Sequence, residues 1–402
     1  MKVLRNTLLF LLGIGLMFLM TIASLMRPDI PLDRLLDTYT DETSAFLEVD
    51  GMRVHYRDEG EGPAVLLIHG TFASLHTWDG WTQAMRDSFR VVRLDLPGFG
   101  LTGPQPDNDY STRASLHVLE TLRKELGIER WSLAGNSLGA RIALDYARYY
   151  PEQTERLILL NAAVGRLPEP DTTASTSVRP DTPAPATPAP GGAENEAPDD
   201  GRLFSNAPAA QQQTNTNAPA AQQPDESSAP AASDTVQTIT RAQNDTPPPG
   251  LRLINHPRTR NLLTVLTPRA VIQLTLKEVY ATEELVDPDI VQRYFELLRR
   301  EGNRAAFLTR NEGATGDRSH LPALPENPRP VTRMELPVLI MWGEADTWIR
   351  VELGRALHER MPGSEFITYP DAGHVPMEEI PGPTAADAIE FLSRPAGLPV
   401  PQ

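Results

Sequence analysis

The chain has 402 residues, of which 40% are hydrophobic, and it contains no cysteine. This is enough apolar material for a sizeable core, and it excludes disulfides, thiolate metal sites, a cysteine nucleophile and cysteine-linked lipid anchors. The formal net charge of −16 argues against nucleic acid or an anionic lipid surface as the main partner, because both would be repelled.

An apolar run without charged residues occupies residues 7–26, after Lys2 and Arg5. At about 1.5 Å of rise per residue it could cross a hydrocarbon core of about 30 Å. The run is longer than the apolar part of most signal peptides, and no small-residue cleavage site follows it. Residues 1–27 are therefore predicted to be an uncleaved transmembrane anchor rather than a signal peptide. Because only Arg27 follows the run closely, the charge bias predicts a single-pass membrane protein with a cytoplasmic N-terminus and an extracytoplasmic remainder.

A polar linker is expected over residues 28–45, and strands alternate with helices after it. Residues 46–56 predict a hairpin, because two alternating runs are joined by Asp50-Gly51. Short apolar runs typical of buried parallel strands follow at 64–69, 90–94, 131–134, 157–161, 338–342 and 365–369. Helical patterns lie between several of them, at 111–126 and 138–150. This alternation predicts an α/β fold.

A low-complexity segment interrupts the pattern at residues 168–250. It is rich in Pro, Ala, Gln, Asn and Thr and has almost no large apolar side chains, so it is predicted to be a disordered insertion. The core then consists of residues 46–167 and 330–394. Helical patterns at 268–281 and 287–300 predict a helical lid over 251–329, and 395–402 is a short tail.

The strongest local signal for chemistry is GNSLG at 135–139, which directly follows a predicted strand and directly precedes a predicted helix. A sharp strand-to-helix turn presents its middle residue above the sheet, and the flanking glycines allow strand and helix to approach closely. Ser137 is therefore the candidate nucleophile, although the motif alone would be weak.

A serine needs a base to take its proton and an acid to orient that base. His374 lies in a turn-rich segment after the last predicted strand, so it is the candidate base. Asp346, in WGEAD at 342–346, follows the preceding strand and is the candidate acid. Glu344 is its main competitor.

The reaction also needs donors for an oxyanion. The backbone N–H groups of Leu138 and Thr71 are the candidates, the latter in the HGTF loop at 69–72. Neither a metal-binding cluster nor a phosphate-binding glycine loop is recognised, and no cofactor is expected.

Five motifs occur in the order shown by the α/β-hydrolase superfamily: HGTF, DLPGFG at 95–100, GNSLG, WGEAD and GHVPMEE at 373–379. The chain resembles its branch of small esterases, carbon–carbon bond hydrolases and epoxide hydrolases. The resemblance implies an eight-stranded, mostly parallel sheet with helices on both faces, a lid after residue 161, and the roles given above for Ser137, Asp346 and His374. Epoxide hydrolases and haloalkane dehalogenases have an aspartate at the elbow, so Ser137 argues against both. The elbow ends in Gly139-Ala140, where many relatives have two glycines.

Three functions remain open. The first is a membrane-anchored carboxylic-ester hydrolase that works through an acyl-enzyme. The second is a carbon–carbon bond hydrolase, lactonase, thioesterase or perhydrolase on the same scaffold, and the third is a non-catalytic binding protein. An apolar acyl or alcohol site is predicted from the aromatic and Met side chains that flank the catalytic loops, which indicates a small apolar ester or related acyl substrate. These side chains are Phe72, Trp78, Trp81, Trp348 and Met377.

Overall fold

The computed structural model describes residues 2–25, 27–164, 267–312 and 321–395. Its centre is an eight-stranded sheet with the strand order β1-β2-β4-β3-β5-β6-β7-β8. The strands are β1 Ser44–Val49, β2 Met52–Glu59, β3 Ala64–Ile68, β4 Arg90–Leu94, β5 Trp131–Asn136, β6 Thr154–Leu160, β7 Val338–Gly343 and β8 Glu365–Tyr369. The predicted α/β class is confirmed, including the mostly parallel sheet.

Antiparallel pairing is confined to one edge of the sheet. β1 and β2 form the predicted hairpin, and both turn residues, Asp50 and Gly51, have positive φ (48° and 75°). β2 also pairs antiparallel with β4, whereas β4, β3, β5, β6, β7 and β8 are parallel neighbours. The carboxyl ends of the parallel strands all lie on the same side of the sheet, and binding and catalytic sites form there in such sheets.

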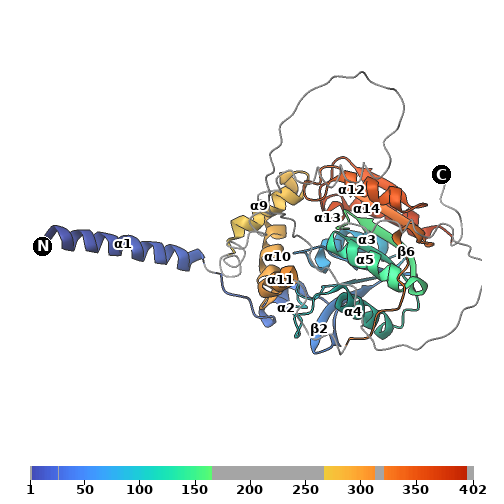
Figure 1. Ribbon diagram of the computed structural model, residues 1–402, viewed down its shortest axis with the longest axis horizontal. Coiled ribbons are helices and arrows are strands. Elements are labelled where there is room, and N and C mark those ends of the chain that lie inside the picture. Colours follow the sequence, from blue (N-terminus) through green and yellow to red (C-terminus); the bar gives the residue numbers. More distant parts are fainter. Residues whose placement is uncertain (1, 26, 165–266, 313–320, 396–402) are drawn as a thin grey trace, which may run out of the picture.

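The strands are continuous apolar runs because a hydrophobic cluster lies on each face of the sheet. Alternate residues of β3 face opposite sides, so Leu66 and Ile68 belong to one cluster and Val65 and Leu67 to the other. The first cluster includes α4 Thr112–Glu125, α5 Leu138–Tyr149 and α12 Val351–Arg360. The second includes α3 Asp79–Met85 and α14 Pro381–Ser393. Helices therefore cover both faces of the sheet (Figure 1).

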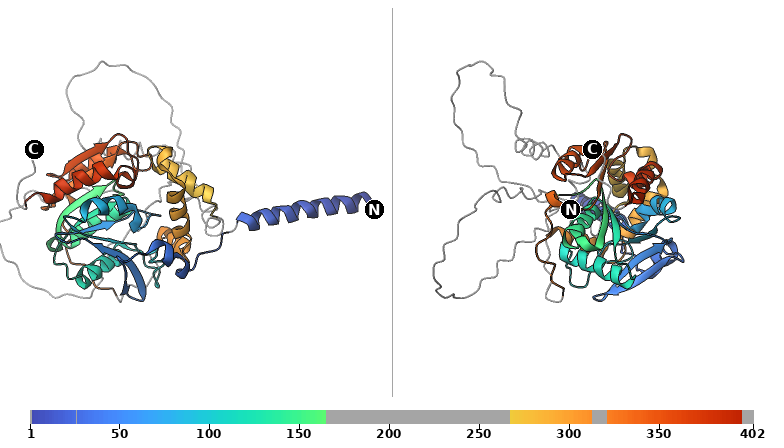
Figure 2. Two further views of the ribbon diagram at one scale, coloured as in Figure 1. Left: turned by 180° about the vertical axis from the view of Figure 1, so that it is seen from behind. Right: turned by 90° about the vertical axis from the view of Figure 1, so that its right-hand side faces the viewer.

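Three further helices form a cap beside the sheet (Figure 2): α9 Arg269–Val279, α10 Pro288–Leu298 and α11 Asn303–Glu312. Leu276 and Val291 of the cap belong to the same cluster as α3 and α14. Part of the predicted lid is thus helical, while the predicted insertion at 168–250 lies outside the described residues.

Residues preceding the hairpin are attached to the cap. Helix α2, Asp33–Tyr39, packs Leu35 and Tyr39 against Leu297 of α10. The Tyr39 hydroxyl donates to Glu296 at 2.7 Å, and Ile30 N donates to the carbonyl of Arg299 at 2.7 Å.

The N-terminal helix α1, Lys2–Leu25, points away from the rest of the molecule (Figures 1 and 2). Crossing a bilayer takes about 20 predominantly apolar residues in one helix. Within the described residues, no helix combines enough length with enough hydropathy to do so. The predicted anchor through residues 7–26, and with it a single-pass protein with a cytoplasmic N-terminus and an extracytoplasmic catalytic domain, is therefore wrong.

Candidate functional site

Ser137 sits on a strained turn between β5 and α5. Its φ of 53° and ψ of −112° are unusual for a residue with a side chain. The two glycines of the motif make the turn possible: a Cβ on Gly139 would lie 2.1 Å from the carbonyl oxygen of Ile68, and one on Gly135 would lie 2.3 Å from that of Gly139. The sequence GNSLG therefore folds here because only glycine permits these backbones to touch.

His374 and Asp346 are brought together at the carboxyl edge of the sheet. His374 Nδ1 lies 2.8 Å from Asp346 Oδ2, and both side chains are buried. The other oxygen, Asp346 Oδ1, accepts from the backbone N–H groups of Trp348 at 2.7 Å and Ile349 at 2.9 Å. These bonds fix the carboxylate and leave Nε2 as the imidazole nitrogen available for proton transfer.

Glu344, the competing carboxylate, points elsewhere. It is exposed, and its Oε1 accepts from the Thr368 hydroxyl at 2.6 Å. The geometry thus favours Asp346 as the partner of the imidazole.

The residue before Ser137 contacts the loop that carries His374. Asn136 Nδ2 donates to the His374 carbonyl at 2.9 Å, which ties the elbow to the base loop. Among the described residues, no hydrogen bond joins the Ser137 hydroxyl to the His374 ring. Such bonds are often long without a substrate and shorten in the reacting complex.

The loop after β3 approaches the elbow from the other side. A Cβ on Gly70 would lie 3.2 Å from Ser137 Cβ and 2.8 Å from Asn136 Oδ1, so the loop passes close to the elbow. Neither Thr71 N–H nor Leu138 N–H has an acceptor within the described part of the chain. Both N–H groups therefore remain the predicted oxyanion donors.

His69 holds the start of this loop. Its Nε2 accepts from Leu96 N at 2.9 Å, so Nδ1 carries the proton and donates to the Gly70 carbonyl at 2.7 Å. Complete burial lowers the pKa of His69, which keeps the ring neutral as this bonding requires. The residue has a structural role in shaping the loop, as its position at the end of a strand suggests.

Asn161 is a site residue that sequence reasoning did not single out. Directly after β6, it donates through Nδ2 to Asp346 Oδ2 at 2.7 Å and to the Gly373 carbonyl at 3.2 Å, and its Oδ1 accepts from Gly343 N at 3.2 Å. It is fully buried and has a φ of 44°. The available signal was a polar residue at the end of the apolar run LILL, at the edge where the site forms.

The aromatic residues expected around the substrate divide into two groups. Trp78, Trp81 and Met377 are completely buried in the second hydrophobic cluster and pack the core. The Trp348 ring lies 5.6 Å from the His374 ring, and the Phe72 ring lies 4.4 Å from that of Phe307 on α11. Of the five predicted residues, Trp348 thus contacts the candidate base, and Phe72 contacts the cap.

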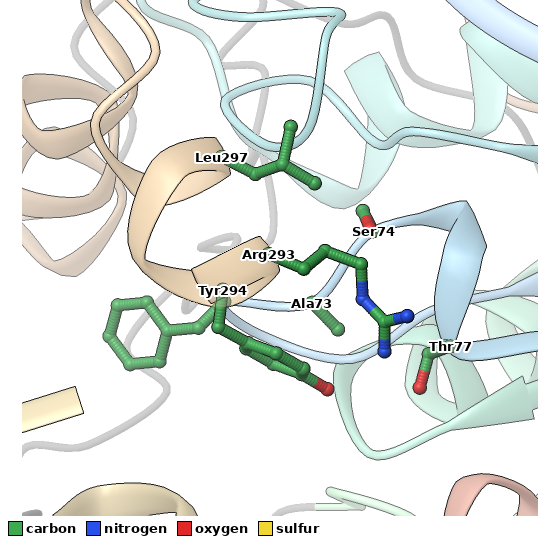
Figure 3. A pocket seen from close by; sticks show the side chains of 7 residues that line it. Ala73, Ser74, Thr77, Arg293, Tyr294 and Leu297 are labelled. Atoms are coloured by element: carbon green, nitrogen blue, oxygen red, sulfur yellow. The ribbon is translucent and has the colours of Figure 1, made fainter. Parts of the chain in front are cut away.

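A shallow pocket lies between the loop after β3 and cap helix α10 (Figure 3). Phe72, Ser74 and Thr77 line it from the sheet side, and Arg293 and Tyr294 from the cap. Ser137 and His374 are not among its lining residues, so it is a neighbour of the candidate site rather than the site itself. Within the described residues, no cluster of His, Asp or Glu is suited to bind a metal.

Comparison with known proteins agrees with this geometry. A protein family described as "alpha/beta hydrolase fold" matches residues 63–381, which is more than half of the chain. The chain belongs to the α/β-hydrolase fold family.

Individual relatives of this α/β-hydrolase match only part of the chain, at moderate sequence identity. An uncharacterized protein of Mycobacterium tuberculosis is 38% identical over 120 residues, which are 30% of this chain and 35% of that protein. A 2-hydroxy-6-oxononadienedioate/2-hydroxy-6-oxononatrienedioate hydrolase of Comamonas testosteroni is 31% identical over 127 residues, covering 29% of this chain and 44% of that protein. The matches thus span less than half the length of these curated relatives. A solved membrane phospholipase A, described as a bacterial virulence factor, superimposes with a TM-score of 0.54 at 21% identity, covering 98% of each chain, and supports the fold alone.

Proposed function

We propose that this protein is a serine hydrolase that cleaves carboxylic esters through an acyl-enzyme. The supporting observation is the buried His374–Asp346 pair at 2.8 Å beside the strained elbow that presents Ser137. A base oriented by a carboxylate next to an elbow serine is the arrangement that activates a hydroxyl for attack on a carbonyl.

Each step uses a group of the chain. Ser137 Oγ attacks the ester carbonyl while His374 Nε2 takes its proton, and Asp346 stabilises the imidazolium. The N–H groups of Thr71 and Leu138 stabilise the oxyanion, a contribution commonly worth about 3–4 kcal/mol per donor. His374 then protonates the leaving alcohol, and a water molecule activated by the same base releases the acid.

A second candidate is hydrolysis of a carbon–carbon bond in a dienoate diketo acid. The observation that favours it is the likeness to the Comamonas testosteroni hydrolase, whose name describes such a substrate. The same scaffold also suits lactones, thioesters and perhydrolysis. All of these reactions would use Ser137 as the nucleophile, so a Ser137 variant would lose each of them. Assays with different substrates are therefore needed to tell the reactions apart.

The test is hydrolysis of p-nitrophenyl esters, from acetate to decanoate, by the full chain. The Ser137→Ala variant should lose the activity, and Ser88→Ala, which changes an exposed serine, should keep it. The acyl length that is hydrolysed fastest would indicate the size of the acyl site. An inert wild type that still reacts with a fluorophosphonate would move the assignment to the second candidate. Absence of both activities would leave a binding protein.

A further inference from the structure

A second buried carboxylate holds the loop that carries His374. Glu379 Oε1 accepts from Gly373 N at 2.9 Å and from Val375 N at 3.2 Å, the two residues that flank the histidine. Glu379 Oε2 accepts from Gly373 N at 3.0 Å and from Ala281 N, just after cap helix α9, at 2.6 Å. The side chain is almost completely buried. One carboxylate therefore connects both sides of the candidate base to the cap.

The cap also binds the histidine directly. His374 N donates to the Val279 carbonyl at 2.8 Å, at the end of α9. A Cβ on Gly373 would lie 2.5 Å from that same oxygen, so base loop and cap touch through their backbones. The backbone of His374 is thus bonded on both sides, because its N–H donates to Val279 and its carbonyl accepts from Asn136. The position of the imidazole therefore depends on the contact between the base loop and the cap.

Only a carboxylate suits the position of Glu379. Its neighbours are three N–H donors, from Gly373, Val375 and Ala281, and they need two acceptor oxygens. An amide of the same size would offer one oxygen and turn an NH₂ group toward donors. Burial raises the pKa of Glu379 above its usual value, and the three N–H bonds oppose this rise.

The adjacent Glu378 serves a different contact. It pairs with Arg293 and accepts from Tyr294 at 2.8 Å and from Thr77 at 2.9 Å, so it joins cap helix α10 to the helical turn after the loop that follows β3. Glu379 alone of the two carboxylates binds the N–H groups that flank the candidate base.

We propose that Glu379 is a positioning residue: it holds His374 at the elbow and couples the base to the end of cap helix α9. This inference rests on the proposed role of His374 as the base. It predicts that loosening Glu379 slows the chemical step, because a base displaced by about 1 Å can cost on the order of 100-fold in rate.

The test compares Glu379→Gln with Glu390→Gln in the full chain. Glu390 is an exposed glutamate on α14 that contacts Arg394, and it has no described contact with the base loop. For each variant, kcat and KM for p-nitrophenyl acetate, the fluorophosphonate labelling rate and Tm are measured. Glu379→Gln should lower kcat and the labelling rate together, by about 10- to 100-fold, with KM nearly unchanged. Glu390→Gln should match the wild type.

A second variant covers the case in which Glu379→Gln does not fold. Ala281→Pro removes the cap N–H donor and turns its ring Cδ toward Glu379 Oε2, so it breaks the same contact from the cap side. Tyr280 before it is extended (φ −86°, ψ 147°), which suits a following proline. Ala281→Pro should lower kcat in the same direction by a smaller factor.

Three results have distinct meanings. A folded Glu379→Gln with wild-type kcat and labelling rate, even at a lower Tm, would overturn the positioning role. If that variant does not fold, wild-type kcat in Ala281→Pro would overturn the role. A wild-type chain that neither hydrolyses esters nor reacts with the fluorophosphonate would overturn the proposed function itself.

Discussion

Replacing Asp346 with asparagine changes the hydrogen bonding of the base without changing its size. In one orientation the amide oxygen still accepts from the N–H groups of Trp348 and Ile349. The NH₂ group then takes the place of Oδ2, where it faces His374 Nδ1 and the Asn161 amide. His374 must then accept at Nδ1 and carry its proton on Nε2, so it cannot take the proton of the nucleophile. The opposite orientation leaves the N–H groups of the partly buried Trp348 and Ile349 without acceptors, at about 1–3 kcal/mol each at most.

The expected loss follows from this wrong tautomer. For a triad in which the acid becomes an amide, kcat falls by about 10⁴, which is about 5.4 kcal/mol at 1.36 kcal/mol per decade. Asp346→Asn should therefore lose p-nitrophenyl acetate hydrolysis to this extent, with KM little changed. Glu344→Gln is the matched control, because Glu344 is exposed and contacts Thr368 instead.

Either of two results would refute the assignment of the acid. One is an Asp346→Asn variant that retains more than about a tenth of the wild-type kcat. The other is a Glu344→Gln variant that loses as much activity as Asp346→Asn.

Three predictions concern stability. The pKa of His69 is lowered by burial, so only the unfolded chain binds its proton as the pH falls below about 6.5; urea unfolding should show stability falling from about pH 7 to pH 5, and a slope that His69→Asn leaves unchanged would contradict this. Gly343→Ala places a Cβ 2.0 Å from the Gly373 carbonyl and should cost about 1–3 kcal/mol of unfolding free energy, whereas Gly382→Ala, which meets nothing within 4 Å, should cost nothing; equal effects would rule out the steric cause. Ser111→Ala removes the acceptor for Ala114 N at the start of α4 and should cost about 1 kcal/mol, and an unchanged denaturation midpoint would argue against the cap.

Local chemistry made much of the sheet predictable. The Asp50-Gly51 pair fixes a hairpin because both residues tolerate positive φ. The elbow could be placed because its glycines have no substitute where strand and helix touch.

Contacts between distant segments could not be predicted in the same way. Asn161 meets Asp346 across 185 residues, and no local pattern specifies that pairing. Trp78 and Trp81 flank the loop after β3 in sequence, yet the way α3 packs on the sheet turns both into the core. The N-terminal run shows the limit of reading hydropathy alone, since its apolar composition suggested a membrane crossing that no described helix supports.

The most direct test of the central claim is to treat the full chain with a fluorophosphonate and locate the adduct by peptide mass spectrometry. The account predicts one phosphonyl group on Ser137 and none in Ser137→Ala. A label on another residue, or no label on a folded protein, would contradict it.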